Sequence, residues 1–261
     1  MPIIKANDIE IFYEFEGNGP PLVFINGFAS THKSISDFII PLKNHFKVLI
    51  FDNREFGETT VAKPPYSIDM MSKDTIGLLK ALKIENAFFV GSSMGSAILQ
   101  KVCLDAPEMV KKAIFIGTFL ELPYPCIMQM HLTKELLDKN IDKDLVLKLT
   151  MTFLYTSDFL KYENNIRKAV DNMKKIKINP NGYDGQVFAL KSFNSSTWLD
   201  QVNTESMILV GEEDIDTPIY CSQRVHEKMK NSTLKIIKNA AHVLYREKPK
   251  ELIDILKSFF K

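Results

Sequence analysis

Residues 86–102 read NAFFVGSSMGSAILQKV, and this stretch decides the fold. Its first half is a short apolar run that predicts a buried strand, and its second half has the apolar spacing of a helix. Between them, Gly91-Ser92-Ser93-Met94-Gly95 is a G-x-S-x-G sequence in the strand–turn–helix setting of a nucleophile elbow. Such an elbow holds its central serine, Ser93, in a strained turn, and its glycines let the strand and helix approach. The alternative is that Ser93 only caps the helix.

Similar apolar runs recur on both sides of this stretch, at 21–27, 46–52, 111–117, 206–211 and 233–239. They predict strands buried on both faces, and helix-period segments separate most of them. Strands that alternate with helices indicate an α/β fold with a mostly parallel central sheet and helices on both faces. The first two strands, near 2–5 and 9–16, are expected to form an antiparallel hairpin at one edge.

The alternation breaks between about 120 and 200, where the pattern is helical and no strand is evident. We therefore expect a core domain made of 1–118 and 200–261, with 119–199 as a helical cap insertion. The stretches 122–125 and 179–182 are rich in turn-forming residues and are interpreted as loops. The insertion is apolar, which predicts a lidded acyl pocket with Met128, Met130, Met151, Phe153 and Tyr155 as candidate lining residues.

Composition excludes several other classes of protein. The 261 residues are 45% hydrophobic and carry a net charge of +1, so no global field steers the chain toward nucleic acid or an anionic membrane. No apolar run is long enough to span a bilayer and no signal peptide is evident, so a cytoplasmic location is expected. The three cysteines, Cys103, Cys126 and Cys221, are far apart, which predicts packed thiols rather than disulfides or a metal site. No metal or cofactor is expected.

A serine hydroxyl needs a base and a group that orients the base. Of the five histidines, His242 is the expected base, because it lies in the loop between the last predicted strand and the last helix, at the sheet edge where ligands bind in open α/β folds. His32 also lies in a loop after an early strand, but it is interpreted, like the other three, as a surface or packing residue. The loop 211–218 reads GEEDIDTP and also follows a strand. Asp214 is the expected supporting carboxylate, with Asp216 as the alternate. The order Ser93, Asp214, His242 is the order found in α/β hydrolases.

Charge that develops on an attacked carbonyl needs fixed donors. Two backbone N–H groups are candidates for this oxyanion hole. Met94 follows the serine at the start of a helix, and Phe28 lies in the turn Asn26-Gly27-Phe28-Ala29 after an early strand. Both side chains could also line a pocket.

Taken together, these motifs resemble the α/β-hydrolase superfamily, in the branch with a small helical cap. The resemblance includes the elbow, the Asn26-Gly27 turn, the D-x-R-G-x-G-x-S-like segment at 52–59, the acid loop, and Ala241-His242 followed by Glu247 and Pro249. The sequence departs from the family pattern at three positions: Asn26 replaces a histidine, Glu55 a glycine and Ala241 a glycine. Residues 182–190 are similar to the cap of 3-oxoadipate enol-lactonases and pimeloyl-carrier-protein methyl esterases.

The residues and the resemblance predict a serine hydrolase that cleaves a small-molecule carboxylic ester or lactone through an acyl-enzyme on Ser93. One alternative is a carrier-protein methyl ester esterase, whose acidic carrier would dock on a basic cluster in the insertion. That cluster comprises Lys161, Arg167, Lys168, Lys174, Lys175 and Lys177. The other alternative is a ligand-sensing protein that keeps the fold but turns over little substrate.

Overall fold

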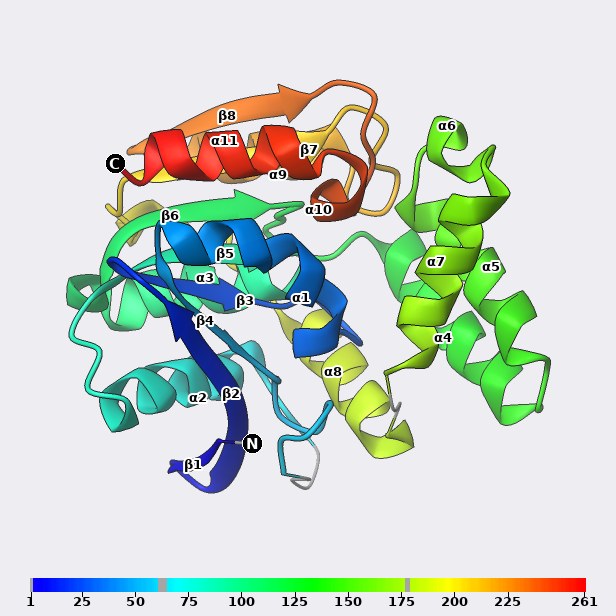
Figure 1. The fold of residues 1–261 in the computed structure, drawn as a ribbon, viewed down its shortest axis with the longest axis horizontal. Coiled ribbons are helices and arrows are strands. Elements are labelled where there is room, and N and C mark those ends of the chain that lie inside the picture. Colours follow the sequence, from blue (N-terminus) through cyan, green and yellow to red (C-terminus); the bar gives the residue numbers. More distant parts are fainter. Residues whose placement is uncertain (1, 61–64, 177–178) are drawn as a thin grey trace.

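A single mixed sheet forms the centre of the protein (Figure 1). The computed structural model describes residues 2–60, 65–176 and 179–261, and within these ranges eight strands pair in the order β1-β2-β4-β3-β5-β6-β7-β8. The strands are β1 (Ile3–Ala6), β2 (Ile9–Gly17), β3 (Pro21–Ile25), β4 (Lys47–Phe51), β5 (Ala87–Ser92), β6 (Val110–Ile116), β7 (Ser206–Gly211) and β8 (Ser232–Ile237). β1 and β2 pair antiparallel at one edge, and β3 through β8 run parallel to one another, as the sequence predicts.

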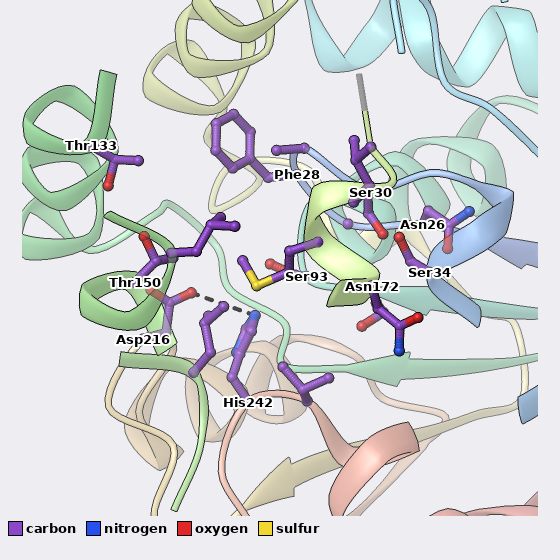
Figure 2. A pocket seen from close by; sticks show the side chains of 18 of the residues that line it. Asn26, Phe28, Ser30, Ser34, Ser93, Thr133, Thr150, Asn172, Asp216 and His242 are labelled. Atoms are coloured by element: carbon purple, nitrogen blue, oxygen red, sulfur yellow. Dashed lines mark ion pairs between the residues drawn. The ribbon is translucent and has the colours of Figure 1, made fainter. Parts of the chain in front are cut away.

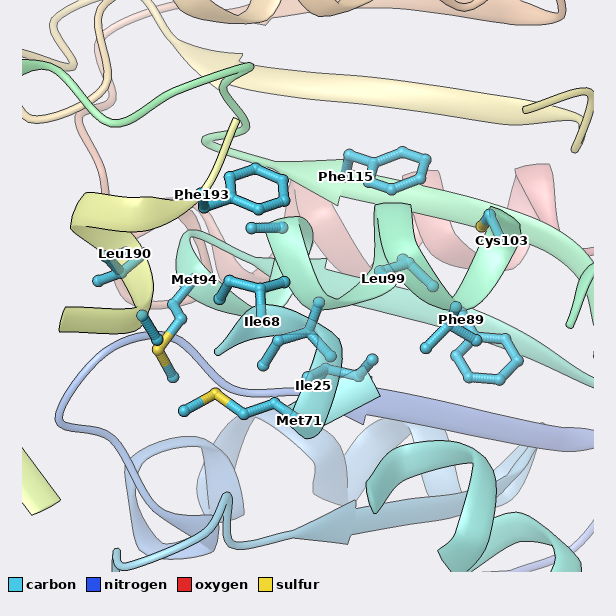
Figure 3. Packing of buried hydrophobic residues seen from close by; sticks show 14 of the residues in the cluster. Ile25, Ile68, Met71, Phe89, Met94, Leu99, Cys103, Phe115, Leu190 and Phe193 are labelled. Carbon is cyan, nitrogen blue, oxygen red and sulfur yellow. The ribbon is translucent and has the colours of Figure 1, made fainter. Parts of the chain in front are cut away.

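Helices cover both faces of the sheet. One face carries α1 (His32–Ile39) and α11 (Pro249–Phe259), and the other carries α2 (Ile68–Ala81), α3 (Met94–Asp105) and α9 (Ile219–Lys228). Consecutive strand residues alternate between the two cores: Phe89 packs with α2 and α3, whereas Phe88 and Val90 pack on the side of α11. Figure 3 shows Phe89, Leu99 and Phe115 in the first of these cores. Apolar residues on both faces explain the continuous apolar runs in the sequence.

The edge strand β8 differs from the expectation of burial on both faces. Burial alternates along its first residues, and Ile236 is exposed. The reason is position: β8 is the last strand of the sheet and has a neighbouring strand on one side only. The apolar run at 233–237 therefore marks a strand but not a central one.

The helices between β6 and β7 lie beyond the carboxyl ends of the parallel strands (Figure 1). They are α4 (Tyr124–Asp138), α5 (Lys143–Leu154), α6 (Ser157–Leu160), α7 (Glu163–Lys174) and α8 (Pro180–Ser192), and we call them the inserted helices. The sequence predicts helices in this region but interprets 179–182 as a loop. In the structure Asn179 caps α8 and Pro180 is its first residue, so these turn-forming residues start a helix. In the described ranges, no helix is long and apolar enough to cross a membrane.

Candidate active site

Ser93 lies at the turn between β5 and α3, as the G-x-S-x-G pattern predicts. Its backbone has φ 54° and ψ −119°, a conformation that costs energy in a residue with a side chain. The turn is held because the Ser93 N–H donates to the carbonyl of Ile116 at 2.8 Å. Ser93 is the N-cap of α3, yet its side chain makes no capping hydrogen bond. The capping alternative is therefore wrong, and the hydroxyl is free for another role.

The two flanking glycines permit this turn. A Cβ on Gly95 would collide with the carbonyl oxygen of Ile25, and a Cβ on Gly91 would collide with the backbone of Gly95. Gly117 has a similar role at the end of the neighbouring strand β6, because it has φ +58° and a Cβ there would touch the His242 ring. Gly91 and Gly95 thus let β3, β5 and α3 approach closely at the serine, and Gly117 leaves room for the His242 ring.

Asp214 and His242 come from loops that follow β7 and β8, and they meet at the same edge of the sheet. The Asp214 carboxylate accepts from His242 Nδ1 at 2.8 Å, and both side chains are buried. Its other contacts are the backbone N–H groups of Asp216 and Thr217 and the Thr217 hydroxyl. These donors fix the carboxylate, which in turn fixes the orientation of the imidazole. Asp214, rather than the alternate Asp216, is the carboxylate at Nδ1.

Asp216 contacts the opposite side of the same ring. Its Oδ2 lies 3.5 Å from His242 Nε2 (Figure 2), and it accepts a hydrogen bond from the Cys126 thiol at 3.0 Å. Burial alone would lower the pKa of His242, but Asp214 and Asp216 outweigh burial and raise the pKa to about 9. Burial also raises the pKa of Asp216. The sequence identified Asp216 as a candidate but did not indicate which nitrogen it would face.

Ser93 and His242 line one cavity together with Asp216 and Phe28 (Figure 2). Within the described residues, no hydrogen bond joins the Ser93 hydroxyl to His242. Catalytic hydrogen bonds are often long in the absence of substrate and tighten when substrate binds. The structure therefore brings the three predicted residues to one site, with the Asp214–His242 hydrogen bond already formed.

The turn after β3, which carries Phe28, lines the same cavity. Ala29 has φ 49°, and its N–H donates to Oε1 of Gln186 in α8 at 3.0 Å. Asn26, which replaces the histidine of the family pattern, is held from both sides: its side-chain amide donates to the Phe51 carbonyl, and its backbone carbonyl accepts from the Asn53 side chain. Nothing in the sequence indicates this role for Gln186, because a glutamine in a helix carries no local signal that it binds a distant turn.

The Phe28 and Met94 N–H groups remain available for a ligand. In the described residues, neither N–H has an acceptor among the loop, turn or side-chain hydrogen bonds. Met94 is fully buried, and a buried N–H without a partner is uncommon. Both groups are therefore donors whose hydrogen bonds a ligand oxygen could accept.

The inserted helices build much of the cavity wall. Met130 of α4 and Tyr155 line the cavity as predicted, and the further apolar residues from this region are Leu137, Val146, Leu147, Leu154, Met173, Ile176 and Tyr183. Three of the predicted lining residues are wrong. Met128 is exposed, Met151 packs in the same apolar cluster as Leu147 and Tyr155 without lining the cavity, and Phe153 does not line the cavity. Apolar residues at helical spacing contributed to core and surface as well as pocket.

Glu247 in α10 (Leu244–Glu247) joins the His242 loop to the inserted helices. Its Oε2 accepts from the Ala241 N–H at 2.7 Å, and its Oε1 accepts from the N–H and hydroxyl of Thr156. The His242 N–H also donates to the Leu154 carbonyl at 3.2 Å. The loop that carries the imidazole is therefore attached to the ends of α5 and α6.

Several members of the basic cluster already have acidic or polar partners. Lys161 pairs with Asp158, and Lys174 pairs with Asp144. Arg167 donates to Asn164 and Lys175 to Asn172, while Lys177 lies outside the described residues. The free positive charge is thus smaller than the sequence suggests, and docking of a carrier protein stays a prediction.

All three cysteines are free and buried, as expected. The described residues contain no cluster of three or more His, Cys, Asp or Glu able to hold a metal.

The parallel sheet, the turn at Ser93 and the chain order of the three residues are those of α/β hydrolases. A family model for the alpha/beta hydrolase fold matches residues 20–249, and the chain belongs to that family. Relatives cover nearly the whole chain at low identity. The provisionally named carbamate hydrolase RutD of Pseudomonas syringae pv. syringae is 23% identical over 239 residues, which is 89% of this chain and 92% of the relative.

Two solved structures show how closely the fold is shared. The enol-lactonase from Burkholderia xenovorans LB400 superposes with a TM-score of 0.87 at 18% identity, over 99% of both chains. An esterase from Exiguobacterium antarcticum superposes with a TM-score of 0.86 at 19% identity, over 98% of both chains. At such identities the likeness establishes the fold, and the chemistry has to be argued from the site.

Proposed function

We propose that the protein is a serine hydrolase that cleaves a carboxylic ester or lactone through an acyl-enzyme on Ser93. The observation that carries the proposal is the buried hydrogen bond between Asp214 and His242 Nδ1, at a cavity that Ser93 also lines. The strained backbone at Ser93 supports it, since such strain is usually retained where function needs it. The enol-lactonase and esterase among the similar structures are in keeping with this chemistry.

The mechanism follows from the roles that each group can fill. Ser93 Oγ attacks the carbonyl carbon while its proton moves to Nε2 of neutral His242. The oxygen of the tetrahedral intermediate accepts hydrogen bonds from the Phe28 and Met94 N–H groups. The imidazolium then gives its proton to the departing alcohol oxygen, which leaves an acyl group on Ser93. Water that His242 deprotonates then attacks the acyl carbon, the bond to Ser93 Oγ breaks, and the imidazolium returns its proton to Ser93 as the acid is released.

The inserted helices are proposed to act as the cap domain, with boundaries near 119 and 199. Their apolar side chains face the cavity beside Ser93, while the polar groups that the reaction needs come from the sheet loops. A pocket of this composition suits an apolar acyl group. We therefore place recognition of the acyl chain in the cap and the bond-breaking chemistry in the core.

The proposal is tested by active-site labelling and by hydrolysis of short p-nitrophenyl esters. We expect a fluorophosphonate to label Ser93 and Ser93→Ala to abolish labelling and to lower kcat by up to about 10⁶-fold, to the background rate. Ser92→Ala is the matched control, because Ser92 is the adjacent residue and borders the same cavity. Wild-type protein that hydrolyses no ester and takes no label at any pH would favour the ligand-sensing alternative.

A further inference from the structure

His242 faces a carboxylate at each ring nitrogen, and the second one is unusual in its position. Asp214 binds Nδ1 at 2.8 Å, whereas Asp216 Oδ2 lies 3.5 Å from Nε2. Nε2 is the atom that has to accept the Ser93 proton in the proposed mechanism. Asp216 therefore occupies the side of the imidazole that the reaction uses, and Figure 2 shows it facing His242 across the edge of the cavity.

The local backbone directs Asp216 inward. Ile215 between the two aspartates is exposed, while Asp214 and Asp216 are both buried, with Asp216 only 7% exposed. From the described part of the chain, the buried carboxylate accepts one hydrogen bond, which comes from the Cys126 thiol, a weak donor. Among the described residues, His242 is the only cationic partner within ion-pair distance of Asp216. A buried carboxylate with so little compensation is stabilised chiefly by a positive imidazole beside it.

The charges around the imidazole favour its protonated form. The acidic groups whose charges act on it are Asp214 and Asp216, which contact the ring from the loop after β7, and Glu247 from α10. Arg246 also borders the cavity, but it is bound to the Ser34 carbonyl. Negative groups thus dominate, and they raise the pKa of His242 to about 9 although burial opposes them. An imidazolium at Nε2 has no lone pair with which to accept the Ser93 proton.

We propose that Asp216 is a positioning residue that holds a proton on His242 Nε2 in the resting enzyme, so that Ser93 is activated only after this proton has left. The inference rests on the proposed function. When the proton passes to solvent, His242 becomes neutral with Nδ1–H on Asp214, and its Nε2 can accept from Ser93. The enzyme is therefore an alkaline hydrolase, and Asp216 sets the lower limit of its working pH.

The test is the pH dependence of kcat/KM for a short p-nitrophenyl ester, and of the fluorophosphonate labelling rate, between pH 5 and 10. Wild type should lose activity below an apparent pKa well above 7. Asp216→Asn should move this limit down by at least about one pH unit, so that activity at pH 6, relative to the alkaline plateau, rises at least about tenfold. Glu213→Gln is the matched control: it removes an equal charge from an exposed residue of the same loop and should leave the limit unchanged.

A measurement independent of turnover keeps the inference separate from the proposed function. NMR titration of the His242 ring in wild type should show an imidazolium through pH 7, and in Asp216→Asn its pKa should fall. An imidazole that is already neutral at pH 7 in wild type overturns the inference, as does an activity limit that Asp216→Asn leaves in place. A different result would overturn the proposed function alone. In that case Ser93 takes no label at any pH, while the pKa of His242 is raised in wild type and falls in Asp216→Asn.

Discussion

At the level of single residues, Asp214 is held more firmly than any other group at the site. Its two oxygens accept from two backbone N–H groups, the Thr217 hydroxyl and His242. A carboxylate with these donors is committed to one orientation and fixes the proton of a neutral His242 on Nδ1. Asp216 is held less firmly, because its contacts are the Cys126 thiol and Nε2 of His242.

We therefore expect Asp214→Asn to lower kcat for a short ester by about 10⁴-fold while leaving the fold intact. The amide is isosteric but no longer stabilises the required tautomer or the imidazolium that forms during the reaction. Steady-state kinetics with circular dichroism as the control for folding would measure this. If Asp214→Asn kept wild-type kcat and Asp216→Asn lost it, the assignment of the two carboxylates would be reversed.

The sequence predicts that Ser93, Asp214 and His242 lie at one edge of the sheet, because each follows a strand and the carboxyl ends of parallel strands meet there. What it could not predict were side-chain directions within a loop. Asp214 and Asp216 are two residues apart, and only the folded turn assigns one to Nδ1 and the other to Nε2. The role of Gln186 was missed for a related reason, since its partner Ala29 is 157 positions away.

At the level of helices and strands, the central strands are easy to predict from the sequence, because they are apolar on both faces and appear as continuous apolar runs. The same pattern overstated burial for β8, since an apolar run does not reveal whether a strand has neighbours on both sides. The inserted helices were harder to interpret. Met128 and Met130 are two residues apart on α4, yet one is exposed and the other lines the cavity. Their roles depend on how the helix is rotated against its neighbours, which is a tertiary property.

Helix α5 offers a direct test of the acyl pocket. Leu147 lines the cavity and is 6% exposed, whereas Leu145 on the same helix is 60% exposed. Each buried methylene contributes about 0.8 kcal/mol, so kcat/KM should rise up to about fourfold per added carbon of the acyl chain until the cavity is filled. Leu147→Trp should narrow the cavity and lower kcat/KM for octanoate esters at least tenfold, with acetate esters little affected.

Leu145→Trp adds the same side chain to the outer face and serves as the control. Its chain-length profile, measured on the same p-nitrophenyl ester series, should match wild type. Equal effects of the two tryptophans, or a profile that Leu147→Trp does not change, would show that the acyl group binds elsewhere.

At the scale of the whole molecule, several buried thiol and phenol groups keep their protons to a higher pH in the folded chain than in the unfolded chain. Burial raises the pKa of Cys103 to about 12 and that of Cys221 to about 11, and it also raises the pKa of Tyr155. Above the ordinary thiol pKa, near 8.5, the unfolded chain releases protons that the native state keeps, so rising pH favours unfolding. The raised pKa of His242 acts in the same direction: its stabilisation is complete below about pH 6.5 and is lost as pH rises through about 9.

The free energy of unfolding should therefore decline between pH 7 and pH 11, most steeply above pH 9. A single buried thiol contributes up to about 1.4 kcal/mol per pH unit in that range. Urea unfolding at a series of pH values would measure the decline, and Cys103→Ala should make it shallower above pH 9 whatever its effect on stability at pH 7. An unchanged slope in this variant would mean that Cys103 ionises as readily in the folded chain as in the unfolded one.

The bridge from Glu247 to Ala241 and Thr156 has a practical consequence for protein engineering. Exchange of the inserted helices for those of another hydrolase is an obvious way to change selectivity. In this protein the exchange would also remove Thr156, whose N–H and hydroxyl bind Glu247 of α10. A chimera that transplants 119–199 alone would remove the Thr156 side chain that donates to Glu247 and would leave the glutamate with its contact to Ala241. The natural unit of exchange in this molecule is the insertion together with residues 241–247.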